Sequence, residues 1–127
     1  MGKKKVLIID DEEDFCLLMQ FYLSKKNCDV SISHTLGEGL IRVNKYLPDI
    51  VILDNNLPDG LGWPAAQNII KAAPGVHLFL ISANKTGSKP DYNSDGENHE
   101  DGESNTKTKI DIVEKPISIS QIDKFLK

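Results

Sequence analysis

Three features that would each place this sequence in a particular class of protein are missing or scarce. No apolar run approaches the roughly 20 residues that span a bilayer, and the N-terminus lacks the apolar segment of a signal peptide. The two cysteines, Cys16 and Cys28, are too few and too poorly spaced for a disulfide framework or a zinc site. The formal net charge is −4, so the chain lacks the excess of basic residues that is typical of nucleic-acid-binding surfaces. These absences predict a cytoplasmic protein that binds neither membranes nor nucleic acid, with cysteines that are buried or half-buried thiols.

The content and pattern of apolar residues indicate a single globular domain. A chain of 127 residues with 39% hydrophobic content can bury one core, so we expect residues 1–127 to form one domain. Short apolar runs alternate with longer amphipathic ones, which is typical of a parallel sheet wrapped by helices. The sequence therefore predicts a doubly wound α/β fold.

Five strands and four helices are predicted. The strands are expected at Lys5–Ile9, Asp29–Ser33, Asp49–Asp54, Val76–Ser82 and Ile110–Pro116. The helices are expected at Glu12–Lys25, at Thr35–Leu47, from Pro64 to about Ala73, and at Ser118–Lys127, where Ser118 is the N-terminal cap. The stretch NNLPDGLG after the third strand is rich in turn residues.

Polar side chains stand where four of the predicted strands end. Asp10 and Asp11 follow the first strand, Asp54 ends the third, Ser82 ends the fourth, and Lys115 lies at the end of the fifth. In an open parallel sheet these ends meet at one rim, where ligands bind. Three clustered carboxylates repel one another unless a cation neutralises them, and hard oxygen ligands suit Mg²⁺. A lysine and a hydroxyl beside them predict a site for a phosphoryl group.

Four fragments at these strand ends resemble the receiver domains of two-component response regulators: LIIDDEE, VILDNNLPDGLG, LISA and VEKP. The resemblance implies a flavodoxin-like (βα)5 fold in which Asp54 is the phosphoacceptor. It also implies that Mg²⁺ or Mn²⁺ is held by side chains and one backbone carbonyl. The implied metal ligands are Asp10, Asp11, Asp54 and the carbonyl of Asn56. Ser82 and Lys115 match the family's hydroxyl and lysine positions and complete the implied site.

The family function that this implies is a phosphorylation-dependent switch. Asp54 would accept a phosphoryl group from a phosphohistidine of a sensor histidine kinase or a histidine phosphotransfer protein, and would release it by slow hydrolysis. Such a domain catalyses its own phosphorylation rather than turning over a substrate, and its downstream partner is unknown. The alternative function is a receiver-shaped interaction module in which phosphorylation is vestigial. An aspartate-nucleophile phosphatase fits less well, because Asn56 stands where such enzymes generally have a second acid.

Each position also has a simpler interpretation. An acidic pair before a helix, such as Asp10 and Asp11, is often only a helix cap and a partner of the helix dipole. Asp54 alone could cap a strand end, and Lys115 could be a solvated charge. The joint placement of these residues at strand ends favours the phosphoryl site.

Two departures from the family pattern stand out. Three residues before Lys115, many relatives carry an aromatic ring that rotates inward on activation. This chain has Ile112 there, and an aliphatic side chain cannot signal a movement of Ser82 by rotating a ring. Residues 85–108 are polar and acidic with almost no apolar side chain, so we expect a disordered loop in place of the family's fourth helix.

The fragment DYNSDG within residues 85–108 matches the start of an EF-hand calcium loop. The match fails at Gly102, where a glutamate is required, which favours a solvated loop over a calcium site.

Overall fold

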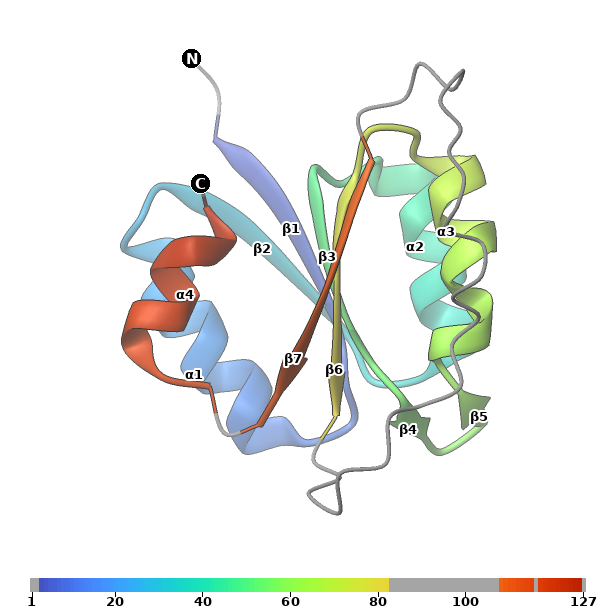
Figure 1. The fold of residues 1–127 in the computed structure, drawn as a ribbon, viewed down its shortest axis with the longest axis horizontal. Coiled ribbons are helices and arrows are strands. Elements are labelled where there is room, and N and C mark those ends of the chain that lie inside the picture. The colour runs from blue at the N-terminus through green and yellow to red at the C-terminus, as the bar shows by residue number, and fades with distance from the viewer. Residues whose placement is uncertain (1–2, 83–107, 116, 127) are drawn as a thin grey trace.

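The computed structural model describes residues 3–82, 108–115 and 117–126, and its centre is a five-stranded parallel sheet (Figure 1). The strand order is β2-β1-β3-β6-β7, and every neighbouring pair is parallel. The strands are β1 (Lys4–Ile9), β2 (Cys28–Ser33), β3 (Ile50–Asp54), β6 (His77–Ser82) and β7 (Lys109–Glu114). This is the doubly wound, flavodoxin-like topology that the sequence predicts.

Helices cover both faces of the sheet, which confirms the predicted three-layer arrangement (Figure 1). The helices are α1 (Glu13–Ser24), α2 (Leu36–Tyr46), the 3₁₀ turn η1 (Trp63–Ala65), α3 (Ala66–Ala72) and α4 (Ile119–Phe125). α1 and α4 lie on one face, and α2 and α3 lie on the other. Ser118 caps α4 as predicted: its hydroxyl accepts from Gln121 N, and Gln121 Oε1 accepts from Ser118 N at 2.9 Å.

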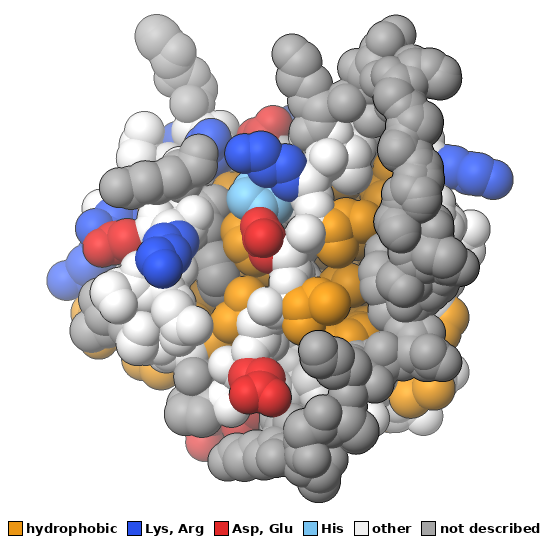
Figure 2. All heavy atoms as spheres, in the orientation of Figure 1, with side chains coloured by type: hydrophobic (Ala, Val, Ile, Leu, Met, Phe, Trp, Pro, Cys, Tyr) orange, Lys and Arg blue, Asp and Glu red, His pale blue; other side chains and the backbone are white. Residues whose placement is uncertain are grey.

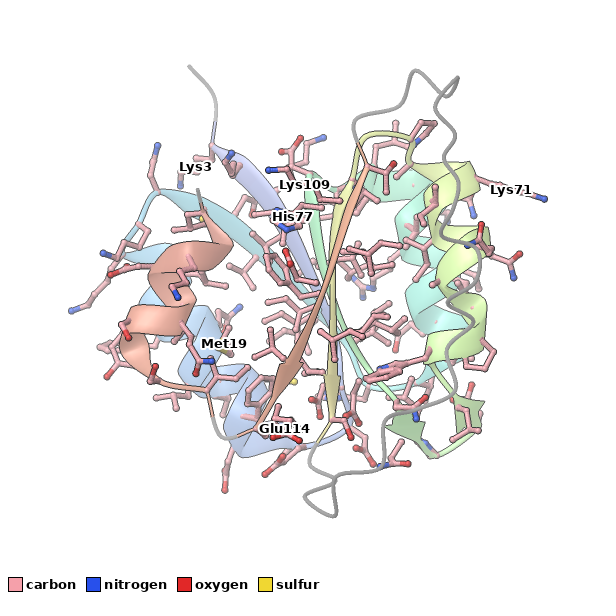
Figure 3. All side chains as sticks on the ribbon, viewed as in Figure 1. Lys3, Met19, Lys71, His77, Lys109 and Glu114 are labelled. Carbon is pink, nitrogen blue, oxygen red and sulfur yellow. The ribbon has the colours of Figure 1, made fainter. Side chains whose placement is uncertain are left out.

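The sheet forms because its central strands are apolar on both faces. Val6, Leu7, Ile8 and Ile9 of β1 are all 0% exposed. Successive side chains of a strand point to opposite faces, so Leu7 and Ile9 pack under α2 and α3, whereas Val6 and Ile8 pack under α1 and α4. Figure 3 shows side chains filling both interlayer spaces, with the buried Met19 of α1 in one of them. The site at the strand ends is therefore built on a rigid support.

Most element boundaries differ from the predicted ones by one or two residues, but the region after β3 differs more. The turn-rich stretch forms a small antiparallel hairpin of β4 (Asn56–Leu57) and β5 (Gly60–Leu61), which the sequence analysis did not predict. Gly60 has φ of 143°, a conformation that favours glycine. The predicted helix from Pro64 begins as a 3₁₀ turn and becomes α-helical only at Ala66. The predicted fifth strand ends at Glu114 rather than at Pro116.

The predicted acidic loop and the calcium alternative fall almost wholly on residues 83–107, outside the described residues. At the edge of that segment, Thr108 Oγ1 accepts from Gly75 N at 3.1 Å. In the described part, none of the helices combines the length and apolar content needed to span a bilayer. Basic, acidic and hydrophobic side chains are interspersed on the face in Figure 2, and no basic stripe crosses its described part.

Candidate functional site

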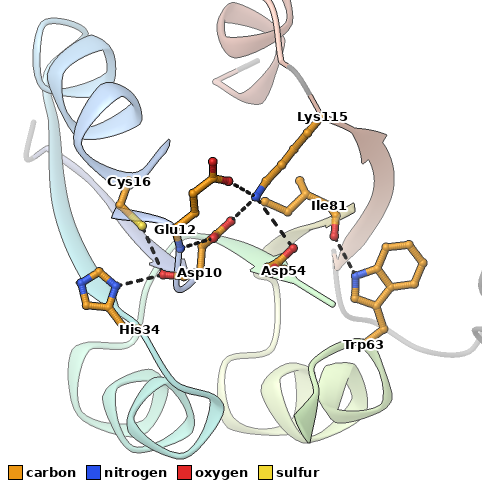
Figure 4. Close-up of polar contacts among 8 residues, drawn as sticks. All are labelled: Asp10, Glu12, Cys16, His34, Asp54, Trp63, Ile81 and Lys115. Atoms are coloured by element: carbon orange, nitrogen blue, oxygen red, sulfur yellow. Dashed lines mark hydrogen bonds and ion pairs between the residues drawn. The ribbon is translucent and has the colours of Figure 1, made fainter. Parts of the chain in front are cut away.

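Four strands bring the predicted polar side chains to one end of the sheet (Figure 4). Asp10 directly follows β1, Asp54 ends β3, Ser82 ends β6 and Lys115 directly follows β7. Backbone hydrogen bonds hold these ends in register, from Asp10 N to Ser33 O at 3.0 Å and from Lys115 N to Ser82 O at 2.9 Å. The convergence therefore follows from the pairing of parallel strands.

The three predicted acids form one cluster. Asp10, Asp11 and Asp54 each offer a carboxylate oxygen, and these oxygens lie within 4.8 Å of one another. Asp10 is 0% exposed and Asp54 is 4% exposed, whereas Asp11 is exposed. Asn56, the fourth predicted ligand, is exposed and opens β4 two residues after Asp54. Its role as a backbone ligand stays a prediction.

The ammonium of Lys115 lies beside this cluster and contacts the β1–α1 segment more closely than it contacts Asp54. Its Nζ is 2.9 Å from Asp10 Oδ2, 3.0 Å from Glu12 Oε1 and 4.0 Å from Asp54 Oδ1. It also lies 4.5 Å from the centroid of the Phe15 ring, a cation–π distance. Lys115 is thus a charge partner of the acids rather than a solvated surface charge.

Crowding of the acids shifts their pKa values. Burial and, to a smaller extent, the neighbouring charges of Asp10 and Asp11 raise the pKa of Asp54 to about 7, against the opposing charge of Lys115. Burial also raises the pKa of Asp10, against the opposing hydrogen bond from Glu12 N and the charge of Lys115. Burial alone would lower the pKa of Lys115, but its acidic partners raise it on balance. The cluster is short of positive charge.

The donor set fits a hard divalent cation. Asp10 Oδ2 is buried, and its one close partner among the described residues is the Lys115 ammonium at 2.9 Å. Three carboxylates within bridging distance, one of them exposed, offer oxygen ligands and leave room for water. Mg²⁺ prefers this combination of oxygen ligands and retained waters.

Asp10 also has a local role, although it is not the cap of α1, because the N-cap residue is Glu12. Its Oδ1 accepts from Glu12 N at 2.8 Å, just before α1 begins. Its backbone carbonyl is contacted by His34 Nδ1 at 3.0 Å and by Cys16 Sγ at 3.3 Å. Asp10 therefore serves both the turn and the site, because one oxygen stabilises the turn while the other faces the site.

The strand end that carries Ser82 is anchored by two bonds. Ile81 O accepts from Trp63 Nε1 and from Asn55 N, each at 3.2 Å. Gly62 passes so close to Asp54 that a Cβ on it would lie 2.1 Å from the Asp54 carbonyl oxygen. Trp63 thus connects the loop after Asp54 to β6.

Glu12 contributes to this site, although its position in the sequence does not predict it. The residue stands within the fragment LIIDDEE, but nothing in the local pattern separates its side chain from those of the neighbouring acids. Only the contact with Lys115, 103 residues away in the chain, identifies it.

Comparison with known proteins agrees with this geometry. The sequence profile of the response regulator receiver domain matches residues 6–93. The chain is 32% identical over 84 residues to the chemotaxis protein CheY of Thermotoga maritima, covering 65% of this chain and 69% of that protein. It is 32% identical over 81 residues to the uncharacterized transcriptional regulatory protein YvcP of Bacillus subtilis, covering 62% of this chain but only 33% of that protein.

Solved structures agree in fold. The signal receiver domain of a putative LuxO repressor from Vibrio parahaemolyticus superimposes with a TM-score of 0.75 at 19% identity, covering 98% of this chain and 87% of that one. At that identity the likeness supports the fold alone, and the profile match over more than half of the chain supports the family. The chain belongs to the response regulator receiver domains, a family whose function is a phosphorylation-dependent switch.

Proposed function

We propose that Asp54 is the phosphoacceptor of this domain and takes its phosphoryl group from a phosphohistidine of a sensor histidine kinase or histidine phosphotransfer protein. The observation that carries the proposal is the convergence of three carboxylates within 4.8 Å beside a lysine ammonium. Asp54 is the member of this cluster at the tip of the central strand β3, and Lys115 lies 4.0 Å from it.

The proposed step is an in-line displacement. An oxygen of the ionised Asp54 carboxylate attacks phosphorus, and the P–N bond to the donor imidazole breaks. The electron pair of that bond returns to the imidazole nitrogen, which takes up a proton, and an aspartyl phosphate remains. Because Asp54 has a pKa of about 7, only part of the cation-free protein has the reactive carboxylate at neutral pH. Nearby positive charge increases that part by favouring the ionised form.

The residues that would hold Mg²⁺ or Mn²⁺ are Asp10, Asp11, Asp54 and the backbone carbonyl of Asn56. A bound divalent ion supplies the positive charge that offsets the repulsion between these carboxylates and the oxygens of an incoming phosphoryl group. Lys115 would move from Asp10 toward the phosphoryl oxygens. Ser82, at the end of the neighbouring strand β6, is placed to donate its hydroxyl to one of them.

The movement of Ser82 would then change the surface that a partner reads. Trp63 and Asn55 both donate to Ile81 O, so a shift of this strand end also pulls on the loop after Asp54. Ile112 on β7 is 54% exposed and has no aromatic ring that could rotate inward, so the conformational change must reach the surface through other residues. Cytoplasmic signal transduction is the setting we propose for this switch, and its downstream partner is a protein.

The test is phosphorylation of the whole chain by acetyl phosphate with Mg²⁺, followed by intact-mass measurement. We expect one added phosphoryl group that depends on the divalent ion and is absent in Asp54→Asn. The matched control is Asp14→Asn, an exposed acid in the first turn of α1, which should be modified as the wild type is. Equal modification of Asp54→Asn would remove Asp54 from this role. No modification of the wild type would favour the interaction-module alternative.

A further inference from the structure

We propose that Glu12 restrains Lys115 in the unphosphorylated protein and thereby slows phosphorylation of Asp54. The inference rests on the proposed function, because it concerns the lysine that this function assigns to the phosphoryl oxygens. Glu12 is a positioning residue in this proposal, since it acts through Lys115 and touches no reacting atom.

The contacts of Lys115 are unevenly distributed (Figure 4). Asp10, Glu12 and Phe15 all belong to the β1–α1 segment, and they lie 2.9 Å, 3.0 Å and, to the ring centroid, 4.5 Å from Nζ. Asp54 is 4.0 Å away, beyond hydrogen-bonding distance. At rest the ammonium is therefore held on the side of the first helix, and it must leave at least one partner to reach a phosphoryl group on Asp54.

Glu12 is the partner whose side chain, among the described residues, is bonded to Lys115 alone. Asp10 is fully buried, belongs to the carboxylate cluster and also accepts a hydrogen bond from Glu12 N, so Lys115 is not its only partner. Glu12 is the N-cap residue of α1, but its side chain makes no capping hydrogen bond. Its backbone N–H donates to Asp10 Oδ1 at 2.8 Å, and its side-chain Oε1 lies 3.0 Å from Lys115 Nζ. The helix does not use this carboxylate, whereas the lysine does.

The exposure of Glu12 limits the expected effect. Its side chain is 57% exposed and that of Lys115 is 11% exposed, so solvent screens the pair from one side. Ion pairs of this kind are weak, and releasing one should change a rate by about two- to five-fold. A restraint of this size would tune the rate of the switch without blocking it.

The experiment compares initial rates of phosphorylation by acetyl phosphate with saturating Mg²⁺ in four proteins: wild type, Glu12→Gln, Glu12→Asp and Glu13→Gln. Glu13 is the matched control, because it is an exposed glutamate in the first turn of α1. The ion-pair partners of Lys115 within the described residues do not include it. Glu13→Gln therefore removes the same charge from the same region without releasing the lysine.

We expect Glu12→Gln to be phosphorylated about two to five times faster than Glu13→Gln. Glu12→Asp, which keeps the charge but shortens the reach by one methylene, should also exceed the wild type. A second readout is beryllofluoride titration followed by the fluorescence of Trp63, the one tryptophan of the chain. Glu12→Gln should bind this phosphoryl mimic more tightly by a similar factor.

Equal rates for Glu12→Gln and Glu13→Gln would overturn the inference, because the effect would then be one of general charge. A rate for Glu12→Gln below that of the wild type would also overturn it, since Glu12 would then assist Lys115. Failure of the proposed function has a different signature: the wild type itself would take up neither a phosphoryl group nor beryllofluoride, and the inference would fall with it.

Discussion

Replacing Asp54 by asparagine should stabilise the cation-free protein, although it removes the proposed phosphoacceptor. Burial and the neighbouring acids raise the pKa of this carboxyl from 3.8 to about 7. The folded protein therefore binds the proton more tightly than the unfolded chain does. Asp54 costs no stability below pH 3.8, costs progressively more between pH 3.8 and 7, and imposes its full penalty above pH 7.

The size of the penalty follows from the shift. A displacement from 3.8 to about 7 is roughly three pH units, and each unit corresponds to about 1.4 kcal/mol, so the penalty is at most about 4 kcal/mol. Asparagine has nearly the same shape, and its amide oxygen can still accept a backbone hydrogen bond. We expect Asp54→Asn to raise the free energy of unfolding by about 2–4 kcal/mol at pH 8, and by much less at pH 5.

The assay is urea unfolding in EDTA at both pH values, with Asp14→Asn as the matched control. Asp14 is exposed, so its replacement should change the free energy of unfolding by less than about 0.5 kcal/mol. Saturating Mg²⁺ should reduce the advantage of Asp54→Asn, because the ion neutralises the same charges in the wild type. Equal stability of wild type and Asp54→Asn at pH 8 in EDTA would refute the electrostatic account of the cluster.

Two further predictions concern the metal site and the packing beneath it. Millimolar Mg²⁺ or Mn²⁺ should raise the melting temperature by binding only the folded state, and Asp11→Ala should blunt the rise; a wild-type melting temperature independent of Mg²⁺ would contradict the site. In α2, Gly37→Ala should stabilise by up to about 1 kcal/mol, because a Cβ there meets only Asp59 Oδ2 at 3.5 Å. Gly39→Ala should destabilise the protein by about 1–3 kcal/mol, because its Cβ would lie 2.6 Å from Ile9 Cδ1. Urea unfolding measures the free energy of unfolding of both variants. Equal effects of the two substitutions would show that the core around Ile9 repacks to accept the added methyl group.

The apolar runs and the residues at their ends were enough to predict the fold class and the meeting of the acids and the lysine at one rim. Runs such as Val6–Ile9 are typical of buried strands, and the helices predicted between them favour parallel pairing. Parallel strands carry their C-terminal ends to one rim, so Asp10, Asp54 and Lys115 could be placed together before any coordinates were known. Boundaries were less predictable: turn residues mark a break after β3 but do not say that it folds into a hairpin.

The tertiary structure alone decided how the side chains at that rim are paired. Which acid holds the Lys115 ammonium depends on the position of β7 beside β6 and on the path of the chain from Asp10 into α1. The anchoring of Ile81 by Trp63 and the raised pKa of Asp54 arise in the same way, from groups that are distant in the chain and brought together by burial. A local pattern contains the identities of such groups but not their distances, and ion pairing and desolvation both depend on distance.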